Sequence, residues 1–563
     1  MINNNTENVE NYFNKNLNNG SFEIMNNKNS YNLNENQNVN EDEIYNTSEK
    51  LLSNNSLPTY STYNEDFKNK KKKKKLKWTT IFSFACPMIG VGGMNLISTT
   101  YASFFYTDII GLKTVGNVHL TLMFTYAFSE PIFGCISDIS KGYIFKTYGK
   151  RKPFLLVSSI FQAVSFFLLL NPPIKINSIG NLKIWSYSLS IIFGMSWGCS
   201  EVAHHSLASQ LTYDYDERSK LQLLTSAVSV IGSTSCGLLN GILGSILDDD
   251  MKNVRKQMFI ITIIYSILYL IGIFVILAVL RDNGSTKEMW NSDMLDRNNS
   301  FKNNYKIIKN MFKNKPFKLL LTAYSFTLLS GAVSPMLLPY FCRYVIESTF
   351  LINWSPLFFT TSAIIGIPFW ICLSKLFSFH SKKWKYILSA GLLCISLTTC
   401  SFVVKKNEEK LFLFFCVIGG LSVGSFFSTP EAMKADVIDY DEFLNGIRND
   451  AKYSGFFMCF ANLIAGIGLK FSLYYINLFG YDNSKNAANE KLTWAIRSAF
   501  AGFISITFLI ICFTMFFYPI DRNLHEKILE GTKLRKSGKC AEDPLNPGKI
   551  LLPFSKIDNQ NLI

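Results

Sequence analysis

Apolar and polar positions along this chain form long blocks rather than the short periods of amphipathic helices or strands. Mostly apolar segments of about 20 residues or more follow one another, each long enough to cross about 30 Å of hydrocarbon. They are expected near residues 79–106, 115–138, 153–172, 184–209, 219–247, 258–280, 317–345, 352–374, 385–404, 411–433, 453–478 and 493–518. The pattern predicts an all-α membrane protein with about twelve transmembrane helices.

The polar stretches between these segments divide the chain into five parts. Residues 1–77 are rich in Asn and end in a run of lysines. They contain too few apolar residues to fold, so a disordered tail is expected. Residues 78–280 and 317–518 carry six spans each, which predicts two six-helix bundles joined by the linker 281–316. Residues 519–563 are expected to form a C-terminal tail.

Basic residues gather in every second loop and just before the first span. Examples are the loop from Lys141 to Lys152 and the stretch from Lys302 to Lys318. By the positive-inside rule, both termini of this multi-pass integral membrane protein are expected in the cytoplasm. No address for a particular membrane is visible.

The net charge of +15 does not alter the prediction of a membrane protein. Such a charge would suit a nucleic-acid partner, but the basic residues lie in short segments between apolar blocks, as in cytoplasmic loops. No nucleic-acid partner is expected. The cysteines lie almost all within apolar segments and show no paired spacing of a metal site, so neither a metal nor a cofactor is expected.

The two halves resemble each other at matching places. Residues 130–138, followed by a basic loop, are echoed by residues 367–375, and residues 214–217 after the fourth span are echoed by residues 439–442 after the tenth. Two parallel six-helix repeats are typical of a transporter whose solute site lies near the middle of the membrane.

Five motifs in matching loops are similar to those of one family. They are Phe105–Leu112, Glu130–Asp138, Tyr148–Pro153, Ser206–Arg218, and Ala435–Glu442 leading to Arg448. Between about Trp78 and Tyr518 the chain resembles the glycoside-pentoside-hexuronide:cation symporters, the melibiose permease-like family of the major facilitator superfamily. The resemblance implies a secondary active transporter, not an enzyme. It would carry a small organic solute, with carbohydrate transport expected, together with a proton or sodium ion by alternating access.

Two charges inside spans are the sharper evidence for a site. Glu130 lies in the second span and Glu201 in the fourth, where an ionisable group costs about 2.5 to 3.5 kcal/mol on insertion scales. In the family both positions resemble acidic sites for the coupling cation or the substrate. The alternative is that the two carboxyl groups only hydrogen-bond between helices.

The neighbours of these glutamates leave the choice of cation open. Tyr126 and Ser129 provide hydroxyls near Glu130, which suits sodium, whereas His204 and His205 follow Glu201 at i+3 and i+4, which suits a proton. The expected cation and substrate residues are Glu130, Glu201, Ser129, His204, Tyr126, Asn462 and Trp197.

The chain departs from melibiose permease at four positions. Tyr126 replaces an acidic residue and Asn462 a basic one, while the family's sugar-binding acid and arginine fall near Gly92 and Ser226. A galactoside is therefore not the expected substrate. Because Asn462 cannot supply a positive charge, at least one glutamate is expected to be protonated in the empty site, which favours proton coupling slightly.

Loop charges predict a gate at the cytoplasmic ends of the helices, where opposite charges can join the halves and separate on alternation. The expected residues are Asp138, Lys150, Arg151, Asp214, Asp216, Arg218, Asp439, Asp441 and Arg448. The alternative is that these charges are solvated and only set the topology. Arg343 and Glu347, spaced i to i+4, are expected to pair at the outer rim.

Other functions remain open on the same fold. A lipid or lysolipid transporter or a scramblase would have the same spans. A membrane-embedded enzyme using Glu201, His204 and His205 would need a nucleophile motif, which the sequence lacks. The expected partners are a small-molecule solute, the coupling cation and the lipid bilayer, and the chain is expected to be a monomer.

Overall fold

The computed structural model describes residues 77–112, 114–139, 151–173, 178–211, 215–247, 251–279, 309, 311–376, 381–446, 450–481 and 490–554. Leu76–Lys533 form one compact unit, whereas Leu534 and the described residues after it belong to a second. The first unit contains all the predicted spans.

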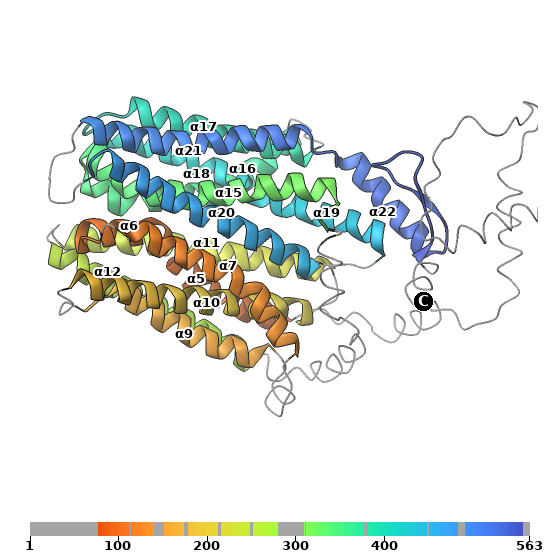
Figure 1. The fold of residues 1–563 in the computed structure, drawn as a ribbon, viewed down its shortest axis with the longest axis horizontal. Helices are drawn as coiled ribbons and strands as arrows, with labels where there is room; N and C mark the ends of the chain where they lie inside the picture. Colours follow the sequence, from red (N-terminus) through yellow and green to blue (C-terminus); the bar gives the residue numbers. More distant parts are fainter. Residues whose placement is uncertain are drawn as a thin grey trace, which may run out of the picture. The chain divides into compact units, whose positions relative to one another are not determined.

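The first half of this unit is a bundle of six helical spans (Figure 1). The first span is interrupted, because Pro87 begins a new helix after Cys86 and π-helical turns follow. Its pieces are α4 (Trp78–Ala85), α5 (Pro87–Leu96), η1 (Ile97–Tyr101), α6 (Ala102–Phe104) and η2 (Phe105–Ile110). The other spans are α7 (Val115–Ile139), α9 (Lys152–Leu170), α10 (Ile179–Leu211), α11 (Tyr215–Ile246) and α12 (Met251–Val279).

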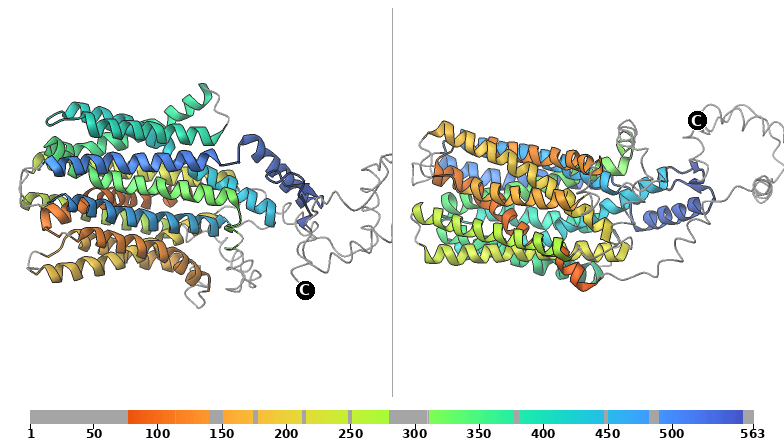
Figure 2. Two further views of the ribbon diagram at one scale, coloured as in Figure 1. Left: turned by 45° about the horizontal axis from the view of Figure 1, so that its top comes forward. Right: turned by 90° about the horizontal axis from the view of Figure 1, so that it is seen from below.

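The second half forms a second bundle beside the first (Figure 2). Its spans are α15 (Lys315–Phe341) continued by η4 (Cys342–Ile346), α16 (Thr349–Leu376), α17 (Lys382–Val403), α18 (Glu409–Phe426) with α19 (Ser428–Asn445), α20 (Asp450–Leu478) and α21 (Glu490–Phe516). Helices therefore cover all the predicted apolar segments, and the prediction of two six-helix bundles is confirmed.

Ten of these spans are long and apolar enough to cross a membrane by length and composition. The two described spans that fall short of this criterion are α7 and α10. These are the helices that carry Glu130 and Glu201. The two spans from which a solute site was predicted are thus the described ones that do not meet the criterion for a membrane-crossing segment.

The tenth span is longer than the sequence analysis expected. It was predicted to end near residue 433, but α19 continues to Asn445 and stops at Gly446, whose φ of 78° is left-handed. The motif from Ala435 to Glu442 is therefore helical, not a loop. Hydropathy missed this extension because Asp436, Asp441 and Glu442 are buried polar residues.

The two halves approach each other closely through α11 and α16. A Cβ atom on Gly241 would lie 2.8 Å from Cδ2 of Trp354, so only glycine permits this packing. Nearby, Nδ2 of Asn240 donates to Oδ1 of Asn353 at 3.2 Å, and the Tyr101 hydroxyl donates to the Ile352 carbonyl at 3.3 Å. These contacts lie at the end of the bundles where the first span finishes. We call it the Ile110 end and the opposite one the Trp78 end.

The C-terminal region contains regular structure within what was predicted as a tail. Helix α22 (Arg522–Lys536) begins after Asp521, whose Oδ1 accepts a hydrogen bond from the Leu524 amide at 2.8 Å. The short strands β1 (Ala541–Glu542) and β2 (Ile550–Leu551) pair antiparallel. They are a minor addition to an otherwise helical protein.

Candidate functional site

Glu130 and Glu201 lie side by side because α7 and α10 pack closely. A Cβ atom on Gly198 would lie 1.7 Å from Oγ of Ser129, so α10 presents glycine where it crosses α7. The Tyr126 hydroxyl donates to Oε2 of Glu201 at 2.5 Å and also interacts with the Glu130 carboxyl. One tyrosine therefore links the two carboxyl groups that the sequence singled out.

The imidazole that contacts Glu201 is that of His205. Its Nε2 lies 3.6 Å from Oε1 of Glu201. His204 instead stacks on Phe84 at 4.1 Å between ring centroids, and its Nε2 is 3.0 Å from the Phe84 carbonyl oxygen. The structure thus places His204, which was expected to face the site, against the first span.

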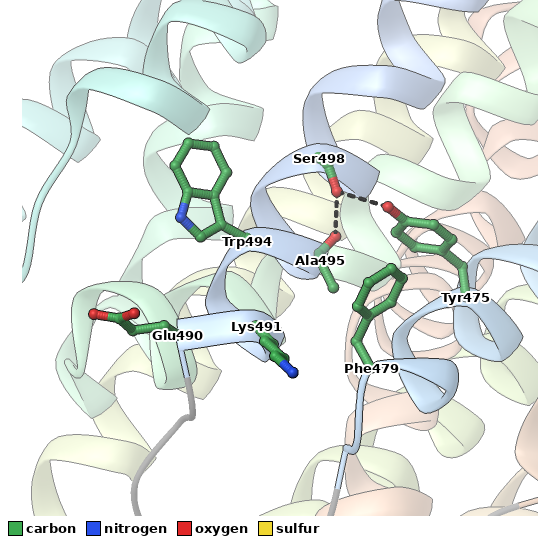
Figure 3. A pocket seen from close by; sticks show the side chains of 7 residues that line it. All are labelled: Tyr475, Phe479, Glu490, Lys491, Trp494, Ala495 and Ser498. Atoms are coloured by element: carbon green, nitrogen blue, oxygen red, sulfur yellow. Dashed lines mark hydrogen bonds between the residues drawn. The ribbon is translucent and has the colours of Figure 1, made fainter.

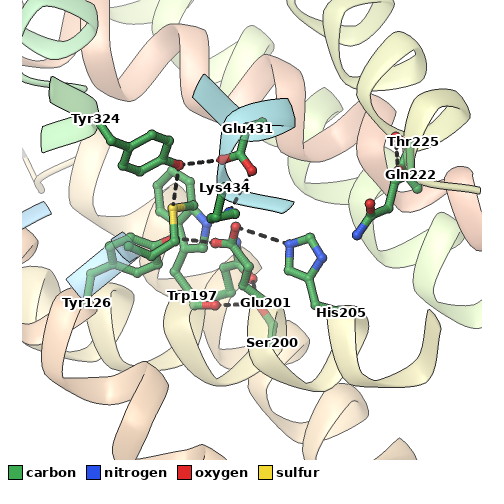
Figure 4. Close-up of polar contacts among 12 residues, drawn as sticks. Tyr126, Trp197, Ser200, Glu201, His205, Gln222, Thr225, Tyr324, Glu431 and Lys434 are labelled. Atoms are coloured by element: carbon green, nitrogen blue, oxygen red, sulfur yellow. Dashed lines mark hydrogen bonds and ion pairs between the residues drawn. The ribbon is translucent and has the colours of Figure 1, made fainter. Parts of the chain in front are cut away.

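Three other expected site residues have different surroundings. The Ser129 hydroxyl donates to the Tyr126 carbonyl at 2.9 Å. The Trp197 ring lies 5.6 Å from that of Tyr126 and borders the carboxylates (Figure 4). Asn462 is buried, and among the described residues its Nδ2 has no hydrogen-bond acceptor.

The second half contributes charges that the sequence analysis did not select. Nζ of Lys434 lies 2.6 Å from Oε2 of Glu431, and the Tyr324 hydroxyl donates to Oε1 of the same carboxylate at 2.6 Å. Figure 4 shows this pair facing Glu201. A glutamate and a lysine three residues apart at the end of the tenth apolar segment were the available signal. Glu431 lies inside the predicted segment, but only the acidic residues at the family's cation and substrate positions were selected, and Lys434 follows the predicted end at residue 433.

We call Glu130, Glu201, Glu431 and Lys434 the glutamate cluster. The Lys434 ammonium acts electrostatically on Glu130, and the His205 imidazole acts on Glu431, so charges from both halves interact. The side chains of Glu201 and Glu431 are 24% and 45% exposed, whereas Glu130 is buried. The cluster can therefore accept a cation from solvent and can donate and accept hydrogen bonds with a polar solute.

The position of the family's sugar-binding acid cannot hold any side chain here. A Cβ atom on Gly92 would lie 1.9 Å from the Ser229 carbonyl oxygen, because α5 and α11 touch at this point. The departure noted at Gly92 therefore reflects helix packing as well as a change of chemistry.

A second buried carboxylate closes the Ile110 end between the halves. Asp108 of η2 accepts hydrogen bonds from the hydroxyls of Tyr344 and Tyr481, and from Oγ1 of Thr107 at 2.8 Å. Nε of Arg343 lies 3.8 Å from Oδ1 of Asp108, whose side chain is 1% exposed. We call these five residues the Asp108 gate. The sequence analysis quoted Asp108 within a motif but gave it no role.

The predicted pair between Arg343 and Glu347 is wrong. Arg343 faces Asp108 across the two halves, and Glu347 forms an ion pair with Lys406. The i to i+4 spacing does not apply because η4 is π-helical and ends at Ile346, and Glu347 follows with a left-handed φ of 61°.

The expected cytoplasmic gate is described only in part. Arg151 donates from Nη1 to the Ser137 hydroxyl within the first half, and Oδ1 of Asp441 accepts from Asn445 at 2.7 Å. Oδ2 of Asp439 lies 3.0 Å from Nε2 of His525 in α22. The side chains of the remaining residues lie outside the described part: Asp138, Lys150, Asp214, Asp216, Arg218 and Arg448.

Helix α22 is held against α19 by a titratable contact. The hydrogen bond to Asp439 raises the pKa of His525 above its ordinary value of 6.5, an effect that burial opposes and the nearby Asp436 reinforces. Lys382 also faces this site, with Nζ 2.7 Å from Oδ1 of Asp436. A Cβ atom on Gly531 would lie 2.7 Å from Cε2 of Phe443, so the two helices are in close contact.

We expect the docking of α22 to weaken as pH rises. Because the docked state raises the pKa of His525, the contact contributes fully below about pH 6.5 and is lost as pH rises through the raised pKa. Amide hydrogen exchange should show greater protection of residues 522–533 in the natural chain than in His525→Gln at about pH 5.5, with the difference shrinking above the raised pKa. Equal protection at the acidic pH would contradict the expectation.

A separate hollow of 320 Å³ lies between α20 and α21 at the Ile110 end (Figure 3). It is lined mainly by Tyr475, Phe479 and Trp494, and the Tyr475 and Ser498 hydroxyls are 3.0 Å apart. It lies within the second half and contains none of the glutamate cluster.

Comparisons with known proteins show which family the sequence matches. The family model described as MFS/sugar transport protein matches residues 83–522. The isoprimeverose transporter of Lactiplantibacillus pentosus is 21% identical over 457 residues, which cover 80% of this chain and 90% of that protein. The sodium-dependent lysophosphatidylcholine symporter 1-A of Danio rerio is 20% identical over 496 residues, covering 81% and 89%.

A solved structure supports the fold independently. The crystal structure of a nucleoside transporter is similar with a TM-score of 0.55 at 12% sequence identity. The match covers 77% of this chain and 99% of that one. The fold is therefore shared with a transporter of known structure.

Proposed function

This chain belongs to the MFS/sugar transport protein family, and on that premise we propose that it carries a carbohydrate-like solute in symport with a proton bound at the glutamate cluster. Family membership makes it a multi-pass secondary active transporter of a small solute, not an enzyme. The observation that carries the proposal is that the Tyr126 hydroxyl links Glu201 and Glu130 of the first half, while the Glu431–Lys434 pair of the second half faces Glu201 (Figure 4).

The groups around Glu130 and Glu201 bear on which cation binds there. Lys434 supplies a positive charge, so the lack of one at Asn462 does not by itself favour a proton. The burial of Glu130 does favour it. The Ser129 hydroxyl donates a hydrogen bond to the Tyr126 carbonyl and the Tyr126 hydroxyl donates one to Glu201, and Glu130 is buried beside them, where loss of solvation disfavours an ionised carboxylate. A buried carboxylate with few other ligands binds a proton more readily than a metal ion.

The groups that surround the glutamate cluster suit a solute with several hydroxyls. Carboxylates accept hydrogen bonds from hydroxyls, and the Trp197 and Tyr126 rings offer aromatic faces beside them. The relative from Lactiplantibacillus pentosus is named as an isoprimeverose transporter. A non-galactoside carbohydrate is thus the substrate class that the site supports best.

Orientation follows from the charge distribution. The lysine run before Trp78 indicates that the Trp78 end faces the cytoplasm, so we propose that both termini are cytoplasmic. We also propose that the chain functions as a monomer. Because the hydrogen bonds described at the Ile110 end join the halves there, this structure would be closed toward the outside.

Proteoliposomes test the proposal directly. Counterflow with a panel of radiolabelled mono- and disaccharides, nucleosides, amino acids and lysophosphatidylcholine should select a carbohydrate. Uptake of that solute should then be driven by an imposed proton gradient without sodium. If counterflow selected the lysolipid, the proposed substrate class would be wrong. If uptake were driven only by a sodium gradient, the proposed coupling cation would be wrong.

A further inference from the structure

Lys434 is the one cationic side chain among the four residues of the glutamate cluster. Its ammonium lies near more than one carboxylate. Its described ion pair is with Glu431, three residues before it on α19. The side chain is only 12% exposed, and Nζ lies 5.6 Å from the ring centroid of Tyr324 and 5.9 Å from that of Phe457. Aromatic faces stabilise an ammonium without neutralising it. Lys434 is therefore held as a charged group in a largely enclosed place.

The same ammonium acts on the carboxylates of the first half. It contributes to the electrostatic environment of Glu130, which lies on α7 and shares the Tyr126 hydroxyl with Glu201. Three ionised carboxylates and one ammonium leave a net negative cluster, so a further cation is attracted. Any cation that binds at Glu130 or Glu201 competes with the Lys434 charge.

We propose that Lys434 is a tethered counter-cation that moves between Glu431 and the Glu130–Glu201 pair, and that the coupling cation binds by displacing it. When Lys434 is on Glu431, the carboxylates of the first half are free to take the cation. When Lys434 turns toward them, its charge expels the cation. The flexible lysine stem, with its rotatable donors, permits both positions.

This assignment rests on the proposed function, because it specifies how the cation site works. It also gives α19 a task in coupling. The tenth span is broken between α18 and α19, and Glu431 lies in the first turn of α19. Movement of α19 relative to α7 and α10 changes the distance between Lys434 and the two carboxylates, which links release of the cation to the rearrangement of the halves.

Opposite shifts in two single variants test the proposal. Cation binding to the purified full chain in nanodiscs is followed by tryptophan fluorescence during titration with protons or NaCl, with Trp197→Phe as the blank. Lys434→Gln should lower the half-saturating cation concentration at least about tenfold, because the competing charge is gone. Glu431→Gln should raise it about tenfold, because Lys434 is left to the other carboxylates.

Two controls separate this role from a structural one. The half-saturating cation concentration of the double variant Glu431→Gln/Lys434→Gln should be closer to that of the natural chain than that of Glu431→Gln is. If one single variant fails to fold, the double variant is measured in its place. Lys470→Gln, an exposed lysine on α20, should change nothing. The natural chain must first be seen to bind the cation. If the two single variants then shift the half-saturating concentration in the same direction, or not at all, the proposed role of Lys434 is wrong. No response of the natural chain to either cation would overturn the proposed function instead.

Discussion

Glu201→Gln and Glu130→Gln should each abolish concentrative uptake while leaving counterflow partly intact. Exchange needs solute binding but no net movement of the cation, whereas accumulation needs a carboxylate that binds and releases it. A membrane potential of about 100 mV stores about 2.3 kcal/mol per elementary charge, which supports about fifty-fold accumulation. In either variant the ratio of internal to external solute should fall to about one.

The measurement is uptake into proteoliposomes under imposed gradients, with the solute that counterflow selects. Glu490→Gln is a suitable control, because this exposed glutamate in the first turn of α21 lies outside the glutamate cluster. Accumulation with the natural dependence on the gradient in Glu130→Gln or Glu201→Gln would show that the replaced carboxyl group only packs between helices.

Asp108→Ala should open the Ile110 end. Asp108 is buried between the halves, where it accepts the Tyr344 and Tyr481 hydroxyls and faces Arg343. Removing the carboxylate leaves the buried Tyr344 and Tyr481 hydroxyls without their acceptor, which costs about 1 to 3 kcal/mol each, and about 3 kcal/mol already shifts a two-state equilibrium more than a hundredfold. The variant should therefore populate a state in which the halves separate at this end.

Native cysteines report this opening. Cys236 and Cys342 are buried and lie near Tyr101, whose hydroxyl joins the halves at the Ile110 end. Mass spectrometry should show their alkylation by N-ethylmaleimide at least about tenfold faster in Asp108→Ala. Cys199, buried within the first half, should react at its natural rate.

A matched carboxylate variant completes the test. Glu347→Gln removes a charge near the same end, but Glu347 is 48% exposed and pairs with Lys406 inside the second half. Exposed pairs contribute about 0 to 1 kcal/mol, so cysteine reactivity should not change. If Asp108→Ala leaves Cys236 and Cys342 as slow as in Glu347→Gln, Asp108 does not hold the halves together.

The spans and the two intramembrane glutamates could be predicted from the sequence alone. A bilayer acts on each segment separately, since every span must be apolar and must satisfy its own backbone hydrogen bonds. Hydropathy is therefore a local property, and it located both bundles. The cost of a charge in hydrocarbon is also local, so Glu130 and Glu201 stood out without knowledge of their neighbours.

Only the tertiary structure decided which groups meet. The rotation of α10 places His205 rather than His204 on Glu201, and α19 pairs Lys434 with Glu431 within electrostatic reach of Glu130 in the other half. Asp108 and Arg343 are far apart in the chain and meet only where the halves close. Such partners depend on helix rotation and on packing between bundles, which sequence spacing along one helix does not encode. The sequence thus determined what crosses the membrane, and the packing of the halves determined how its charges are paired.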